Sequence, residues 1–250
     1  MTERWSARWL RSGVQVLAGT VLLVVGTLGL WGEVGRARTL RVAHALRSPD
    51  TRPDPATIDA TLAERAWRNA SLASQRDVLM AAAWISAMHA TRLHRTGPLD
   101  AANAADTIAA DRLTGLMADG PSQPLGWYLI AEHNLATAGF SNEVTGALRL
   151  SYVTGRFDVR SAERRIAMLL RYWPLLQAEF GAELKSDVRT LVFGQGYDLT
   201  NSRLAYIAHY EAPAQAQRLR QTLGEVKPDY LYWFDWEIAQ IKKGLAAKPG

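Results

Sequence analysis

The hydrophobic pattern of the chain is dominated by an apolar run over residues 13–32, which contains no charged side chain. A helix of this length rises about 1.5 Å per residue and spans roughly 30 Å, the hydrocarbon thickness of a bilayer. Because a helix satisfies its own backbone hydrogen bonds in lipid, we predict one transmembrane helix here. A cleaved signal peptide and a buried helix of a soluble protein are the alternatives. A signal peptide ordinarily has a shorter apolar region and a cleavage site of small residues, which does not follow here.

Basic residues on both sides of this run bear on its orientation. Residues 1–12 hold three arginines, and residues 36–47 hold four, so the positive-inside count is nearly balanced. A short basic tail before a first span is the arrangement of a signal anchor. We therefore expect a single-pass protein of the inner (cytoplasmic) membrane with a cytoplasmic tail over residues 1–12 and a periplasmic C-terminal domain.

Three glycines of the apolar run share one side of the predicted helix. Gly19, Gly26 and Gly29 fall within about 80° of one another at 100° per residue. A smooth stripe of small residues allows a second membrane helix to approach closely. Glycine is also common in membrane helices in general, so packing against a partner helix and plain composition both explain the stripe.

The pattern after the membrane predicts helices almost throughout. Residues 33–55 suggest a juxtamembrane helix and a linker that ends in a proline-rich stretch. Residues 56–244 then show apolar positions at helical spacing, separated by glycine and proline turns, and residues 245–250 form a tail. No alternating strand pattern is present. We predict an all-α fold: short antiparallel helices in series, as in a degenerate α-solenoid.

Particular residues set the expected helix boundaries. Gly139 is expected to make a turn, Ser141 to cap the next helix, and Gly155 to leave that helix with a positive φ. Pro174 is expected to break the helix that ends near residue 172. The helices after residue 56 are expected near residues 56–70, 74–96, 100–119, 124–138, 141–155, 158–172, 182–193, 202–210, 213–223 and 228–243.

The segment 125–192 carries a recognisable series of packing motifs. It contains W-x-x-x-A from Trp127, a glycine turn, A-L-R-L-S-Y-x-x-G from Ala147, and E-R-R-x-x-x-L-L-R-Y-W-x-L-L from Glu163. This series resembles bacterial membrane-anchored, tetratricopeptide-like helical proteins that are associated with extracellular polysaccharide or O-antigen assembly. The resemblance implies a helical-repeat fold, a place in envelope polysaccharide assembly, and partners among membrane or periplasmic proteins.

Composition excludes several classes of protein. The 250-residue chain has no cysteine, so disulfides and thiolate metal sites are excluded. Its net charge of +5 is spread thinly beyond the basic tail, which is unlike a nucleic-acid surface. Serine nucleophile elbows, phosphate loops and dinucleotide fingerprints are absent. We expect no nucleic-acid partner.

Few polar residues suggest chemistry. The five histidines, His44, His89, His94, His133 and His209, show no paired ligand spacing, so no metal and no cofactor is expected. Glu179, Glu183 and Asp187 are spaced by four and would form a carboxylate row on one helix. Gly181 is expected to interrupt this row, and Lys185 and Arg189 to neutralise it, which favours a solvated face over a pair of catalytic carboxylates.

The aromatic segment 230–237 is the most distinctive local feature. On a helix Tyr230, Trp233 and Phe234 share one face, which we predict to be core. Tyr232 and Trp236 point the opposite way and are the candidate residues for binding a ligand or a partner. A place in the core or a cap at the end of the helical array is the favoured alternative for them.

These features together predict a non-catalytic accessory or scaffold protein of envelope or extracellular polysaccharide assembly. The expected partners are the membrane and other inner-membrane or periplasmic proteins, with polysaccharide as a further candidate. One alternative is a structural or assembly subunit of another membrane complex, held through the glycine stripe. Another is a glycan-cleaving enzyme that uses Glu179 or Glu183.

Overall fold

The computed structural model describes residues 37, 39–42, 57, 72–195 and 197–244. In this part of the chain every regular element is helical, so the all-α prediction is confirmed. No helix among these residues is long and apolar enough to cross a membrane. The predicted span over residues 13–32, including Gly19, Gly26 and Gly29, lies outside the described residues. So do the tails and most of the linker.

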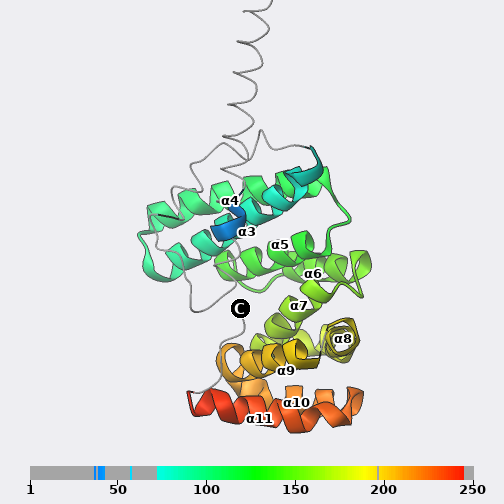
Figure 1. The fold of residues 1–250 in the computed structure, drawn as a ribbon. Coiled ribbons are helices and arrows are strands. Elements are labelled where there is room, and N and C mark those ends of the chain that lie inside the picture. The colour runs from blue at the N-terminus through cyan, green and yellow to red at the C-terminus, as the bar shows by residue number, and fades with distance from the viewer. Residues whose placement is uncertain (1–36, 38, 43–56, 58–71, 196, 245–250) are drawn as a thin grey trace, which may run out of the picture.

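Six long helices form three consecutive hairpins (Figure 1). Helix α3 packs along α4, α5 along α6, and α7 along α8; helix α5 also contacts both α3 and α7. The hairpins therefore follow one another in space in chain order. The helices are α3 (Leu72–Thr96), α4 (Leu99–Asp119), α5 (Pro124–Thr137), α6 (Asn142–Thr154), α7 (Val159–Arg171) and α8 (Trp173–Gly194).

The last part of the chain closes one end of this stack. Helix α10 packs on α8, and α11 packs on α9. Its elements are α9 (Tyr197–Tyr206), the π-helical turn η2 (Ile207–Glu211), the short turn η3 (Pro213–Gln215), α10 (Ala216–Val226), the turn η4 (Pro228–Tyr230) and α11 (Leu231–Lys242). One continuous apolar cluster extends from Trp84 on α3 to Phe234 on α11, so the hairpins share a single core.

The hairpin turns follow from a few residues. Gly139 between α5 and α6 adopts φ +82°, a conformation that glycine takes without strain, and the hydroxyl of Ser141 accepts a hydrogen bond from the backbone N–H of Val144. Helix α7 ends at Arg171 and α8 begins at Trp173, with Pro174 in its first turn. The predicted turn, cap and helix break at these positions are confirmed.

Two glycine predictions are wrong. Gly155 has φ −161°, an extended conformation. A Cβ atom there would lie 2.4 Å from Cγ of Pro124, so this glycine allows α6 to approach the start of α5 closely. Gly181 does not interrupt a helix, because α8 continues through it from residue 173 to residue 194. A glycine inside a helix costs only about 1 kcal/mol, which the packing of the long apolar face of α8 outweighs.

Candidate functional site

A buried arginine joins three helices at the centre of the stack. Arg165 on α7 is fully buried and forms an ion pair with Asp187 on α8, with Nη2 2.8 Å from Oδ1. Its Nη1 donates to the backbone carbonyls of Ser151 (3.1 Å) and Gly155 (3.2 Å) at the end of α6. The carbonyls at a helix C-terminus carry partial negative charge and attract a cation. Arg165 therefore fixes α6, α7 and α8 relative to one another.

An aromatic residue completes this cluster. The hydroxyl of Tyr152 on α6 donates to Asp187 Oδ2 at 2.7 Å, and its ring lies 4.3 Å from the Arg165 guanidinium carbon. Phe180 of α8 stacks on the same ring, with centroids 5.9 Å apart. Burial raises the pKa of Asp187 to about 6, although the hydrogen bonds from Arg165 and Tyr152 lower it. Burial, followed by the nearby charge of Asp187, raises the pKa of the Tyr152 hydroxyl well above its usual range.

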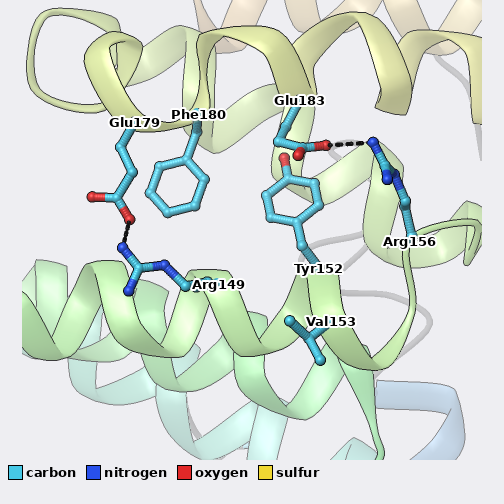
Figure 2. A pocket seen from close by; sticks show the side chains of 7 residues that line it. All are labelled: Arg149, Tyr152, Val153, Arg156, Glu179, Phe180 and Glu183. Carbon is cyan, nitrogen blue, oxygen red and sulfur yellow. Dashed lines mark hydrogen bonds and ion pairs between the residues drawn. The ribbon is translucent and has the colours of Figure 1, made fainter.

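A groove lies over this cluster, between α6 and α8 (Figure 2). Its volume is about 440 Å³. Two ion pairs cross it: Arg149 Nη2 lies 2.6 Å from Glu179 Oε1, and Arg156 Nη2 lies 3.7 Å from Glu183 Oε2. Between these pairs lie the rings of Tyr152 and Phe180, and the exposed Val153 lies at the edge. We call this site the α6–α8 groove.

The predicted carboxylate row exists on α8, and the predicted solvated face holds for Glu179 and Glu183 but not for Asp187. Glu179 and Glu183 line the groove, whereas Asp187, one turn further along α8, is inaccessible to solvent. Helix α8 continues through Gly181, so all three carboxylates lie on one helix.

The predicted partners of these carboxylates are wrong as well. The cations that pair with them are Arg149, Arg156 and Arg165, which come from α6, from the turn after α6 and from α7. Lys185 instead pairs with Glu225 of α10 at 3.0 Å. These partners lie on other elements, so the pattern of a single helix did not reveal them.

The geometry of the groove suits binding. Both groove carboxylates take part in ion pairs with arginines. Exchangeable ion pairs on a rigid floor offer both donors and acceptors to a charged or hydroxyl-bearing ligand. Among the described residues no group of three histidine, aspartate or glutamate side chains is placed to hold a metal ion.

Two histidines of the described part of the chain, His94 and His133, contact other elements or the core. His94 of α3 pairs with Asp106 of α4. His133 of α5 is buried, and its burial lowers its pKa, although the charge of Asp106 raises it. His44 lies outside the described residues.

The aromatic segment near the C-terminus forms a second exposed feature. Tyr232 is 68% exposed and Trp236 is 44% exposed on α11, so both are accessible for binding. Trp233 was expected in the core but is also 44% exposed, while Phe234 and Tyr230 are buried. The ring of Trp233 makes edge-to-face contacts with both candidates, at centroid distances of 5.2 Å to Tyr232 and 6.0 Å to Trp236. Trp233 belongs to this exposed cluster because α11 is the last helix and has no neighbour on that face among the described helices.

Sequence reasoning missed Arg165, Arg149 and Arg156. For the first of these a signal lies in the helical pattern, because the positions one turn before and after Arg165, Ala162 and Leu169, are apolar and buried. A charge inside an apolar stripe requires a buried partner of opposite charge. Asp187 is embedded in the same way in the apolar stripe of α8.

Comparison of the chain with protein-family models, with curated proteins and with solved structures gave no match. The resemblance of segment 125–192 to membrane-anchored, tetratricopeptide-like proteins stays a prediction. Functional assignment here follows from the geometry of the chain itself.

Proposed function

We propose that this protein is a non-catalytic, membrane-tethered scaffold that binds a partner protein in the α6–α8 groove. The setting implied by the sequence resemblance is assembly of an envelope or extracellular polysaccharide. The periplasmic side of the inner membrane is the location that accords with the basic tail and the apolar run over residues 13–32.

The observation that carries the proposal is the groove and its rigid floor. The groove has about 440 Å³ of space and presents two arginines and two glutamates, while Arg165 and Asp187 hold its walls in place underneath. A pre-organised surface loses little conformational entropy when a partner binds. Tethering to the membrane raises the effective concentration of this surface near a membrane-embedded partner.

Site-specific photocrosslinking tests this function. A photoreactive amino acid replaces Val153, which is 76% exposed at the edge of the groove. The matched control places the same group at Leu99, which is 71% exposed at the start of α4. We expect position 153, and not position 99, to capture an envelope-polysaccharide synthesis protein in intact cells.

Charge exchange in the groove distinguishes binding from a structural role. Arg149→Glu removes one ion pair, and Arg149→Glu combined with Glu179→Arg restores the pair in reversed orientation. If the groove binds a partner by its charge pattern, both variants lose the crosslink at position 153. Recovery of the crosslink in the double variant, or identical adducts at positions 153 and 99, would count against the proposal.

A second candidate function is cleavage of a glycan. One observation favours it: Glu179 and Glu183 line the same cavity, and glycosidases use a pair of carboxylates. The test measures release of reducing ends from envelope polysaccharide by the wild type and by Glu179→Gln with Glu183→Gln. If the wild type releases reducing ends and the double variant does not, the protein is an enzyme and the scaffold proposal is wrong.

A further inference from the structure

A second cavity lies on another face of α7. Its volume is about 80 Å³, and it is lined by side chains from α3, α5, α7 and α9. Arg160, Glu163 and Arg164 of α7 lie at helical spacing on one face, whereas Arg165 is turned towards α6 and α8. The full lining is Trp84, Leu125, Arg160, Glu163, Arg164 and Arg203. We call this cavity the arginine pocket.

Two arginines of this pocket, Arg164 and Arg203, are held in place by neighbours. The guanidinium carbon of Arg164 lies 4.7 Å from the ring centroid of Trp84, which is buried on α3. Arg203 Nη1 of α9 lies 3.7 Å from Glu163 Oε1, and both side chains are less than 20% exposed. Packing against an aromatic face and a carboxylate orients planar guanidinium groups before any ligand arrives.

The charges of the pocket do not balance. Three guanidinium groups face one carboxylate, so the lining carries two positive charges in excess. Charges in a half-buried cleft interact more strongly than charges in bulk water, because the surrounding medium has a lower dielectric constant. The lining therefore attracts an anion, and an anion with two negative charges neutralises it.

The size of the cavity restricts the ligand. A space of about 80 Å³ is large enough for a few water molecules or one tetrahedral anion. Guanidinium groups donate paired hydrogen bonds to phosphate oxygens in a matching geometry. We propose that the arginine pocket binds a dianionic phosphate group, either free phosphate or the phosphate monoester end of a larger molecule.

The experiment uses the full chain in nanodiscs made of zwitterionic lipid. Inorganic phosphate is titrated at constant ionic strength, and binding is followed by isothermal titration calorimetry and by broadening of the phosphate ³¹P resonance. We expect saturable binding at one site, with weaker binding of the dicarboxylate succinate. Vesicles with phosphatidic acid, compared with phosphatidylglycerol vesicles, test a lipid headgroup as the source of the monoester.

Substitutions assign the site. We expect Arg164→Gln and Arg160→Gln each to weaken phosphate binding by tenfold or more. Glu163→Gln removes the one carboxylate of the lining and should strengthen binding severalfold. Arg149→Gln, in the α6–α8 groove, is the matched control and should leave phosphate affinity unchanged. Arg160 is exposed, so its variant tests the site even if Arg164→Gln unfolds.

The possible results separate clearly. Binding only to phosphatidic acid vesicles, with the same dependence on Arg164, identifies a lipid phosphate as the ligand. Tighter binding of succinate than of phosphate contradicts the proposal. So does equal weakening by Arg164→Gln and Arg149→Gln, which would indicate unspecific attraction. These measurements need no partner protein, so their outcome is independent of the photocrosslinking at position 153.

Discussion

The consecutive residues Arg164 and Arg165 of α7 have opposite electrostatic surroundings. Arg165 is fully buried, and its charge is cancelled by Asp187 and by the carbonyl oxygens at the end of α6. Arg164 stacks on Trp84 in a pocket that keeps an excess of positive charge. Full burial requires a charge to be neutralised within the protein, whereas a partly open cleft lets solvent or a ligand complete the balance. The difference separates an arginine that organises the fold from one that is available for recognition.

Removal of Asp187 should show the largest effect. Asp187→Ala leaves Arg165 charged, buried and short of hydrogen-bond acceptors, which costs about 3–5 kcal/mol of unfolding free energy. Urea unfolding of the detergent-solubilised chain, followed by circular dichroism, measures this loss. Combining Arg165→Met with Asp187→Leu should recover part of it, since an apolar pair removes the unpaired charge. A loss below 1 kcal/mol for Asp187→Ala would contradict the role assigned to the pair.

The pH dependence of stability should depend on Asp187. Burial raises its pKa from 3.8 to about 6, so between these values the folded protein holds a proton that the unfolded chain has released. This contribution to stability is complete below about pH 4 and is lost as the pH rises through 6. Its slope is at most about 1.4 kcal/mol per pH unit.

Asp187→Asn is the matched variant for this measurement. Asparagine has nearly the shape of the protonated acid and still offers an oxygen to Arg165. At each pH, the unfolding free energy of this variant is subtracted from that of the wild type. The difference should increase as the pH falls. A difference of opposite sign would show that the ion pair lowers the pKa of Asp187 instead.

Two glycines of one hairpin should respond in opposite directions. Gly155→Ala places a methyl group 2.4 Å from Cγ of Pro124, and the required shift of α6 should cost about 1–3 kcal/mol. Gly146→Ala meets no atom within 4 Å inside α6 and should stabilise the helix by up to about 1 kcal/mol. Thermal denaturation of both variants measures the contrast, and similar midpoints would remove the argument for close approach at Gly155.

The groove ion pairs should contribute least to stability. Arg149 and Glu179 are 66% and 37% exposed, and exposed pairs contribute about 0–1 kcal/mol. Arg149→Gln should therefore change the unfolding free energy by less than about 1 kcal/mol while it reduces crosslinking at position 153. A large loss of stability in this variant would show that the ion pair stabilises the fold and does not serve recognition.

Local signals in the sequence predicted much of the fold and little of the site. Gly139, Ser141 and Pro174 set boundaries by backbone chemistry that acts within a few residues, and those boundaries are confirmed. The predictions for Gly155 and Gly181 were wrong because the roles of these residues depend on atoms from other helices or on the packing of a whole helix face.

The site depends on pairs that are distant in sequence. Arg165 and Asp187 are 22 residues apart, and Arg149 and Glu179 are 30 apart, so no spacing rule for one helix connects them. Arg165 and Asp187 each lie in an apolar helical stripe, which marks these two residues as needing a buried partner. Trp233 was misplaced for a related reason: periodicity tells which residues share a face, and it does not tell whether a neighbouring helix covers that face.

The hydrogen bonds of Arg165 to α6 and α8 have a consequence for how this chain opens. Stacked hairpins ordinarily unfold piecemeal, because each one touches only its neighbours. Here, detaching α7 would leave the charge of Asp187 buried without its partner Arg165. We therefore expect α6, α7 and α8 to open as one cooperative unit. Amides of these three helices should then exchange with solvent hydrogen at a common slow rate. Helices α4 and α11, whose ion pairs to neighbouring helices are partly exposed, should exchange through smaller and more frequent openings.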